Sequence, residues 1–190
     1  LKGDETGAGK TVQSILAADM RMRISGGRCI IITKLGPKDQ WTEAIARFIP
    51  QDVENISSNP NDGKKWTVMH YDEFSVKSTR EKLSQQIEAM VNAGQIRCII
   101  LDECHSVKND SNRTDFIQRF TKNCRFVWGL SATVVANKPI DIYNQLKAVN
   151  HPLSKMSWYT FATQLGGMTM EPMTIKYKDK DTGEEVRRRI

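Results

Sequence analysis

Short apolar runs alternate with amphipathic stretches along most of the chain. Four runs are continuous, five or six residues long and rich in β-branched side chains, as expected of strands that are covered on both faces. These predicted strands are Arg28–Thr33, Trp66–His70, Arg97–Leu101 and Arg125–Leu130. In the stretches between and around them, apolar residues recur at helical spacing and predict helices. The predicted helices are Lys10–Ile24, Asp39–Phe48, Arg80–Ala93, Asn112–Thr121 and Pro139–Val149.

This alternation predicts an α/β fold. Strands separated by helices argue for βαβ units, which build a mostly parallel sheet with helices on its faces. Residues 51–65 are polar and rich in turn-forming residues, so we expect a loop there. Towards the end of the chain, Asp181-Thr182-Gly183 could turn a hairpin. The three arginines at 187–189 are more typical of a solvated end than of a binding patch.

Composition is that of an ordinary globular domain. The chain has 190 residues, of which 39% are hydrophobic and 26% charged, and this excludes a disordered tail, a collagenous chain and a disulfide-rich mini-protein. We expect no membrane partner, because no apolar run approaches the roughly 20 residues that cross a bilayer. The net charge of +6 is compatible with nucleic-acid binding without demonstrating it.

The cysteines carry no metal or disulfide signature. Cys29, Cys98, Cys104 and Cys124 form no CxxC pair, and three of them lie in or beside apolar runs. We therefore expect buried free thiols in a reducing intracellular compartment. The chain opens on Leu1 without an initiator Met, so we expect it to be a piece of a longer protein.

The glycine-rich segment GDETGAGKT, residues 3–11, predicts a nucleotide-phosphate site. Small residues let backbone amides wrap phosphates, while the helix that begins here adds its positive dipole end. Lys10 would reach the outer phosphates, and the Thr11 hydroxyl could ligate magnesium. The predicted phosphate-binding residues are Gly7, Ala8, Gly9, Lys10 and Thr11. The strict phosphate-loop pattern fails, since Asp4 stands where its first glycine belongs, and a flexible glycine turn is the alternative.

An acidic pair, Asp102-Glu103, follows the apolar run Ile99–Leu101. Asp102 would hold a magnesium ion through water, and Glu103 would position and deprotonate the attacking water. The alternative is a solvated acidic turn at the end of a strand. His105 could link these carboxylates to neighbours, or it is a surface imidazole.

Two hydroxyl residues, Ser131 and Thr133, follow the last predicted strand. Their side chains could hydrogen-bond carboxylates or carry a signal between sites. Hydroxyl residues after a strand are weak evidence for a functional site. They become informative only because they follow the glycine loop and the acidic pair in the chain.

In this order, GDETGAGKT, LDECH and LSAT resemble the first RecA-like lobe of superfamily-two helicases and translocases, with a DExH box at 102–105. Further segments resemble the Swi/Snf-type branch of DNA translocases, which is related to chromatin remodellers. These are Asp4-Glu5, Gln40-Trp41-x-Glu43, Ser106–Asn109, LSATVVANKPIDIYNQL and Trp158-Tyr159-x-Phe161. The chain departs from that branch at Thr6, Ala8, Cys104 and Val134, and by SAT in place of TGT, which leaves room for a divergent bacterial or viral member.

The resemblance implies a P-loop NTPase that uses ATP and Mg²⁺. Gly7, Gly9 and Lys10 would cradle phosphates, Thr11 and Asp102 would hold the metal, and Glu103 would be the catalytic base. His105, Ser131 and Thr133 would couple hydrolysis to nucleic-acid contact. Lys34, Lys38 and Tyr71 are candidate contacts to a duplex DNA backbone, with solvated lysines and a core tyrosine as equally weighted alternatives. The match at Trp41 points to packing rather than chemistry.

The expected domain organisation is a lobe at 1–165, truncated at its start, and an extension at 166–190 that is a hairpin or the start of an insertion. A complete motor of this type has a second RecA-like lobe that supplies arginine fingers, and we expect that lobe to be missing here. The chain alone should therefore hydrolyse ATP barely, if at all.

The resemblance predicts the first lobe of an ATP-dependent translocase on double-stranded DNA, in the cytoplasm or nucleus, with a viral or phage origin left open. A strand-separating DExH helicase lobe acting on RNA or DNA is the alternative. A degenerate lobe that serves only as a binding module is the third reading.

Overall fold

The computed structural model describes residues 8–76, 78–107, 112–132, 142–165, 174–178 and 185–189. Its helices are α1 (Lys10–Ser25), α2 (Lys38–Phe48), α3 (Arg80–Asn92), α4 (Asn112–Thr121), α5 (Ile142–Ala148) and α6 (Trp158–Gln164). Its strands are β1 (Arg28–Thr33), β2 (Ile56–Ser57), β3 (Trp66–His70), β4 (Ile96–Leu101), β5 (Phe126–Gly129), β6 (Thr174–Lys178) and β7 (Glu185–Arg189). The four predicted strands and five predicted helices are confirmed, with bounds that differ by a few residues.

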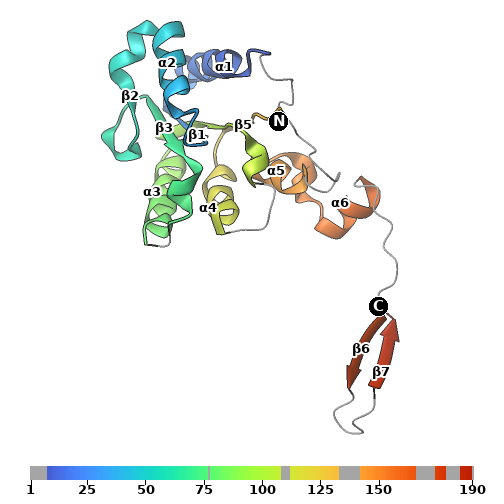
Figure 1. Cartoon of the computed structure of the whole chain (residues 1–190). Helices are drawn as coiled ribbons and strands as arrows, with labels where there is room; N and C mark the ends of the chain where they lie inside the picture. Colours follow the sequence, from blue (N-terminus) through green and yellow to red (C-terminus); the bar gives the residue numbers. More distant parts are fainter. Residues whose placement is uncertain are drawn as a thin grey trace.

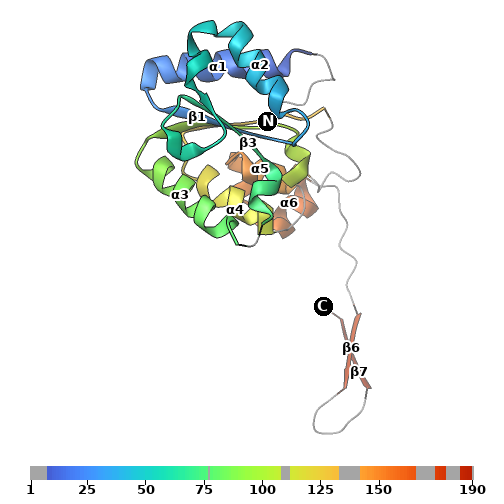
Figure 2. The same ribbon diagram turned by 60° about the vertical axis from the view of Figure 1, so that its left-hand side comes forward.

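A parallel sheet with the strand order β2-β3-β1-β4-β5 forms the centre of the described structure. All four of its strand pairs are parallel, with β1 between β3 and β4. Helices α1 and α2 cover one face, while α3, α4 and α5 lie on the other (Figures 1 and 2). The predicted α/β class with a mostly parallel sheet is confirmed.

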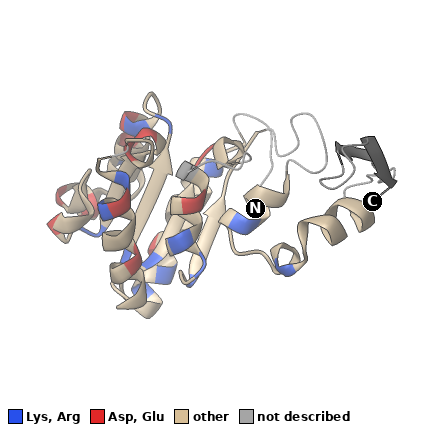
Figure 3. Ribbon diagram, turned by 90° about the horizontal axis from the view of Figure 1, so that it is seen from below, with Lys and Arg blue, Asp and Glu red and all other residues tan. Residues whose placement is uncertain are grey.

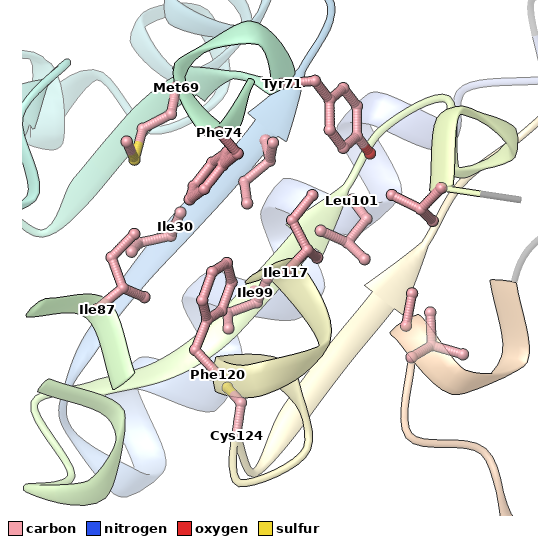
Figure 4. Close-up of a cluster of buried hydrophobic side chains, with 14 of the residues drawn as sticks. Ile30, Met69, Tyr71, Phe74, Ile87, Ile99, Leu101, Ile117, Phe120 and Cys124 are labelled. Carbon is pink, nitrogen blue, oxygen red and sulfur yellow. The ribbon is translucent and has the colours of Figure 1, made fainter. Parts of the chain in front are cut away.

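Each central strand is buried on both faces, which explains the continuous apolar runs. In β1, Cys29 and Ile31 face α1 and α2, while Ile30 and Ile32 belong to the cluster under α3 and α4. We call the first group the α1/α2 cluster. It contains Ile15, Ala18, Met22, Cys29, Ile31, Trp41, Ile45, Ile49, Trp66, Val68, Cys98, Ile100 and Leu130. The opposite cluster includes Phe74 and Phe120, whose ring centroids lie 5.7 Å apart (Figure 4).

The alternation of side chains also fixes the direction of the residues at the strand ends. Positions 29 and 31 of β1, and 98 and 100 of β4, point into the α1/α2 cluster. The next positions of the same parity are Thr33, at the end of β1, and Asp102, directly after β4. Both therefore come out on the α1/α2 side of the sheet, at its carboxyl edge.

The predicted loop at 51–65 is only partly correct. It contains the short 3₁₀ helix Pro50–Asn55, the edge strand β2 and a second 3₁₀ turn, Pro60–Asp62. A two-residue strand is too short to show any periodicity, so the sequence pattern could not reveal it. At the other end of the chain, β6 and β7 pair antiparallel, and the predicted turn residues Asp181-Thr182-Gly183 lie outside the described residues.

The cysteines are buried free thiols, as predicted. Burial raises the pKa of Cys98 and Cys104 to about 12 and that of Cys124 to about 11. The Cys29 thiol, also buried, has a pKa well above the usual 9.0. These thiols therefore stay protonated and unreactive at neutral pH.

In the ribbon of Figure 3, Lys and Arg positions are interspersed with Asp and Glu positions along the helices that cover the sheet. In the part of the chain that the structure describes, no helix is long and apolar enough to cross a membrane.

An ionic network ties α1 to the start of β3. Lys65 Nζ donates to Asp19 Oδ1 at 2.8 Å and to Asp52 Oδ2 at 2.5 Å, and Arg23 Nε donates to Asp19 Oδ2 at 2.6 Å. Burial alone would raise the pKa of Asp19, but the hydrogen bonds from Lys65 and Arg23 outweigh it and hold that pKa below 3.8. Asp19 therefore stabilises the fold while it is ionised.

We expect Asp19→Asn to lower the free energy of unfolding by about 1–3 kcal/mol at neutral pH, because it weakens a partly buried charged hydrogen-bond network. Because the pKa of Asp19 is lower in the folded chain, its contribution is present above the unfolded pKa and is lost as the pH falls through the folded one. Urea unfolding should show the gap between wild type and variant closing below about pH 4. Glu81→Gln breaks the exposed Arg119–Glu81 pair and should cost less than about 1 kcal/mol. Equal losses of unfolding free energy in Asp19→Asn and Glu81→Gln would show that the network around Asp19 stabilises the fold no more than an exposed ion pair.

Candidate nucleotide site

A cavity of about 360 Å³ opens at the carboxyl edge of the sheet. Its lining comes from four separate segments: the start of α1, the start of α2, the turn after β4 and the segment after β5. The lining residues are Gly9, Lys10, Thr11, Pro37, Gln40, Asp102, Glu103 and Ala132. In open α/β sheets, ligands bind at this carboxyl edge. The last three residues of the predicted glycine loop, Gly9–Thr11, and the acidic pair therefore line one cavity, although they are about ninety residues apart in the chain.

The start of α1 suits an anion. Gly9 is the N-cap and has φ 73°, a left-handed conformation that favours glycine. The first turn of the helix carries no acidic side chain. Gln13 Nε2 donates to the Ala8 carbonyl at 3.1 Å, which holds the loop against the helix. Backbone N–H groups and the helix dipole thus offer positive charge beside Lys10 and Thr11.

Asp102 is held by three hydrogen bonds. Its Oδ2 accepts from Thr33 Oγ1 at 2.9 Å and from Trp41 Nε1 at 2.8 Å. Its Oδ1 accepts from the backbone N–H of Glu103 at 3.0 Å. Trp41 is only 1% exposed, so the predicted packing role is confirmed, but the bond to Asp102 was not predicted.

The turn at Glu103 is conformationally unusual. Glu103 has φ 48°, in the left-handed region, which costs a non-glycine residue about 1–2 kcal/mol. Both ends of the peptide that precedes it are fixed. Tyr71 OH donates to the Asp102 carbonyl at 2.8 Å, and the Glu103 N–H donates to Asp102 Oδ1. Such conformations persist where the surroundings over-determine them, and they cluster at functional sites.

His105 joins Glu103 to Ser131. Its Nδ1 lies 3.0 Å from Glu103 Oε2 and 3.1 Å from Ser131 Oγ, and its Nε2 lies 3.1 Å from Lys34 Nζ. A lysine ammonium can only donate, so Nε2 accepts and the proton of the neutral ring is on Nδ1. This tautomer donates towards the Glu103 carboxylate and the buried Ser131.

The three candidate DNA contacts, Lys34, Lys38 and Tyr71, do not line this cavity. Tyr71 is 2% exposed, in the short helix Tyr71–Phe74, so it is a core tyrosine here and not a surface contact (Figure 4). Lys34 is exposed, whereas half-buried Lys38 lines a different cavity beside β2. Gly7 and Thr133 lie outside the described residues.

Sequence reasoning missed four groups at the site: Thr33, Pro37, Gln40 and Ala132. Thr33, Pro37 and Ala132 lie at a strand end or within the next four residues, so strand parity and the carboxyl-edge rule were the available signals, whereas Gln40 lies in the first turn of α2.

The donor atoms at the cavity fit a magnesium ion. The Thr11 hydroxyl and the Asp102 carboxylate are hard oxygen donors, which Mg²⁺ prefers. Among the described residues, no group of three or more His, Cys, Asp or Glu side chains could hold a metal. A metal here would therefore depend on phosphate and water oxygens as well, as is usual for Mg²⁺ at nucleotide sites.

The chain matches known proteins along most of its length. The family model of the SNF2-related domain matches residues 1–185. The chain is similar to the SWI/SNF-related matrix-associated actin-dependent regulator of chromatin subfamily A-like protein 1. The identity is 24% over 162 residues for the Drosophila melanogaster protein and 27% over 154 residues for the Xenopus tropicalis protein. These matches cover 85% and 78% of this chain but only 20% and 15% of those relatives.

Solved structures share the fold. The Sulfolobus solfataricus SWI2/SNF2 ATPase core in complex with dsDNA superposes with a TM-score of 0.63 at 16% identity, over 87% of this chain and 34% of that one. The Pyrococcus furiosus Hef helicase domain gives 0.58 at 19% identity, over 79% of this chain and 32% of that one.

We expect Tyr71→Phe to lower the free energy of unfolding by about 0.5–1.5 kcal/mol, because it removes a partly buried hydrogen bond to the Asp102 carbonyl. Tyr159→Phe, at an exposed tyrosine, is the control and should change stability by less than about 0.5 kcal/mol. Chemical denaturation measures both. Duplex-DNA affinity that falls in Tyr71→Phe while stability stays unchanged would restore Tyr71 as a DNA contact.

Proposed function

Because the chain belongs to the SNF2-related domain family, we propose that it is the first ATP-binding lobe of an ATP-dependent translocase that moves on double-stranded DNA. The observation that carries this proposal is the single cavity shared by the helix start at Gly9–Thr11 and the acidic turn at Asp102-Glu103. Phosphate-binding amides and metal-binding carboxylates face each other in enzymes that cleave nucleotide phosphates.

The hydrolytic roles follow from what each group can donate or accept. The amides at the start of α1 and the Lys10 ammonium bind the phosphates of ATP. Thr11, and Asp102 through water, would hold the Mg²⁺, which would neutralise charge on those phosphates. Glu103 orients the attacking water and takes its proton. The Nδ1–H of His105 steadies the Glu103 carboxylate, so the imidazole acts on the base and not on the nucleotide.

The imidazole of His105 also links DNA binding at Lys34 to the catalytic base Glu103. Lys34 is exposed at the carboxyl end of β1, and its ammonium lies 3.1 Å from His105 Nε2. A DNA phosphate that binds Lys34 competes with His105 for this ammonium, and the change reaches Glu103 and Ser131 through one ring. The Sulfolobus structure contains dsDNA, which supports duplex DNA as the partner. We include Lys38 as a second backbone contact, and binding through both would fall with salt.

We propose that the complete motor contains parts beyond this lobe, because the chain spans about a fifth or less of the length of the curated relatives that it matches. A second RecA-like lobe supplies arginines that stabilise the transition state, worth about 10³–10⁵ in rate, so the 190-residue chain alone binds ATP weakly and hydrolyses little. From the sequence, we also assign Gly7 to phosphate binding and Thr133 to the coupling of hydrolysis to DNA contact. The relatives' names and the buried thiols support an intracellular site of action, in the cytoplasm or nucleus.

In the full-length protein, Glu103→Gln should lower DNA-stimulated ATP hydrolysis by about 10²–10⁴-fold, because it removes the general base. ATP affinity should stay within about twofold, since the amide keeps the size of the carboxylate and the phosphate-binding groups are untouched. Glu81→Gln, on an exposed part of α3, is the control. Phosphate release and equilibrium ATP binding measure the two effects. Turnover equal to that of wild type would remove Glu103 from the role of base.

Duplex DNA should stimulate hydrolysis by the full-length protein more than single-stranded DNA or RNA of the same length, because the track is the phosphate backbone of a duplex. The stimulation should fall steeply between about 50 mM and 200 mM salt. Steady-state ATPase assays with the three polymers measure this. A preference for RNA would favour the strand-separating helicase and contradict the translocase.

A further inference from the structure

The Asp102 carboxylate has an unusual set of partners. We propose that Trp41 and Thr33 are positioning residues that hold Asp102 through Oδ2 and so keep Oδ1 available to a metal-bound water. The inference rests on the proposed function, since it concerns how the same site binds Mg²⁺. Neither side chain belongs to the phosphate loop or the acidic pair, and neither lines the cavity.

The hydrogen-bond count assigns the two oxygens different tasks. An ionised carboxylate has about four lone-pair positions, two on each oxygen. Oδ2 accepts from Thr33 and from Trp41, so both of its positions are used. Oδ1 accepts one bond, from the Glu103 N–H, and keeps one position. That remaining position is the one that a water on the metal can use.

Both donors are rigid. Trp41 is 1% exposed in the α1/α2 cluster, and Thr33 is 0% exposed at the end of β1. Thr33 is β-branched and has restricted χ1 freedom, and the indole of Trp41 is packed among the side chains of its cluster. The carboxylate is thus fixed by two separate elements, a strand end and a helix.

Both donors are also uncharged. A lysine or arginine bonded to Oδ2 would compete with Mg²⁺ for the negative charge of Asp102. An indole N–H and a hydroxyl orient the carboxylate and leave its charge to the metal. Partners of this kind, one step removed from the metal, usually contribute about 10–100-fold to metal affinity.

A second buried tryptophan provides a matched control. Trp66 is 0% exposed, and its Nε1 donates to Asp52 Oδ2 at 2.9 Å. That bond has the same chemistry as the bond from Trp41 to Asp102, but Asp52 pairs with Lys65 and does not line the nucleotide cavity. Trp66→Phe therefore reports what losing such a bond does to the fold alone.

The test uses Thr33→Val, Trp41→Phe and Trp66→Phe in the full-length protein, with Thr33→Ser as the conservative variant. Binding of a fluorescent ATP analogue is measured in EDTA and across a Mg²⁺ titration. We expect Thr33→Val and Trp41→Phe to raise the Mg²⁺ concentration for half-maximal effect about tenfold or more. Their affinity for the analogue in EDTA should stay within about twofold of wild type, because the phosphate loop is untouched. Trp66→Phe and Thr33→Ser should keep the wild-type Mg²⁺ midpoint.

Midpoints in Thr33→Val and Trp41→Phe equal to that of Trp66→Phe would overturn the inference. If Trp41→Phe does not fold, the nearly isosteric Thr33→Val decides alone, and a wild-type midpoint in it overturns the inference as well. Failure here is distinguishable from failure of the proposed function. If Glu103→Gln loses ATP hydrolysis and Thr33→Val keeps the wild-type Mg²⁺ midpoint, only the positioning role is rejected. If Glu103→Gln hydrolyses ATP like wild type, the assignment of Glu103 as the base is rejected.

Discussion

The parallel pairing of β1 with β4 determines on which side of the sheet Thr33 and Asp102 lie. Ile32 stands opposite Leu101, and the pairing continues one step further, with the Asp102 N–H donating to the Ile32 carbonyl at 2.8 Å. Because side chains alternate along both strands, this register sends Thr33 and Asp102 to the same side of the sheet. Trp41 lies on that side, packed in the α1/α2 cluster. A slip of one residue would turn Asp102 towards the opposite, apolar cluster and would separate it from both donors.

The turn after β4 adds a second constraint. Glu103 adopts a left-handed conformation, and the peptide before it is fixed by Tyr71 on one side and by the Asp102 carboxylate on the other. The stable core thus holds a locally unfavourable turn, and the turn aims Glu103 into the cavity and brings His105 to its side. The rigid sheet therefore holds the strained turn in place, and the turn positions Glu103 and His105 for the proposed chemistry.

The sequence predicted the strands and the facing motifs because both leave strong local signals. Continuous apolar runs marked β1 and β3 to the residue, and the order of glycine loop and acidic pair indicated the cavity. The edge strand β2 was missed because two residues show no period. Tyr71 could not be assigned because the short helix after β3, and not the residue type, turns its side chain inwards. The bond from Trp41 to Asp102 depends on the packing of α2 against the sheet, which no local pattern encodes.

The most direct test of this account is a crystal structure of the full-length protein with Mg²⁺ and a non-hydrolysable ATP analogue. We expect the phosphates at the start of α1 and a metal-bound water on Asp102 Oδ1. Oδ2 should keep its bonds to Thr33 and Trp41 at the present lengths of 2.9 Å and 2.8 Å. A carboxylate rotated so that Oδ2 leaves both donors and binds the metal or its water would contradict the positioning of Asp102 by Thr33 and Trp41.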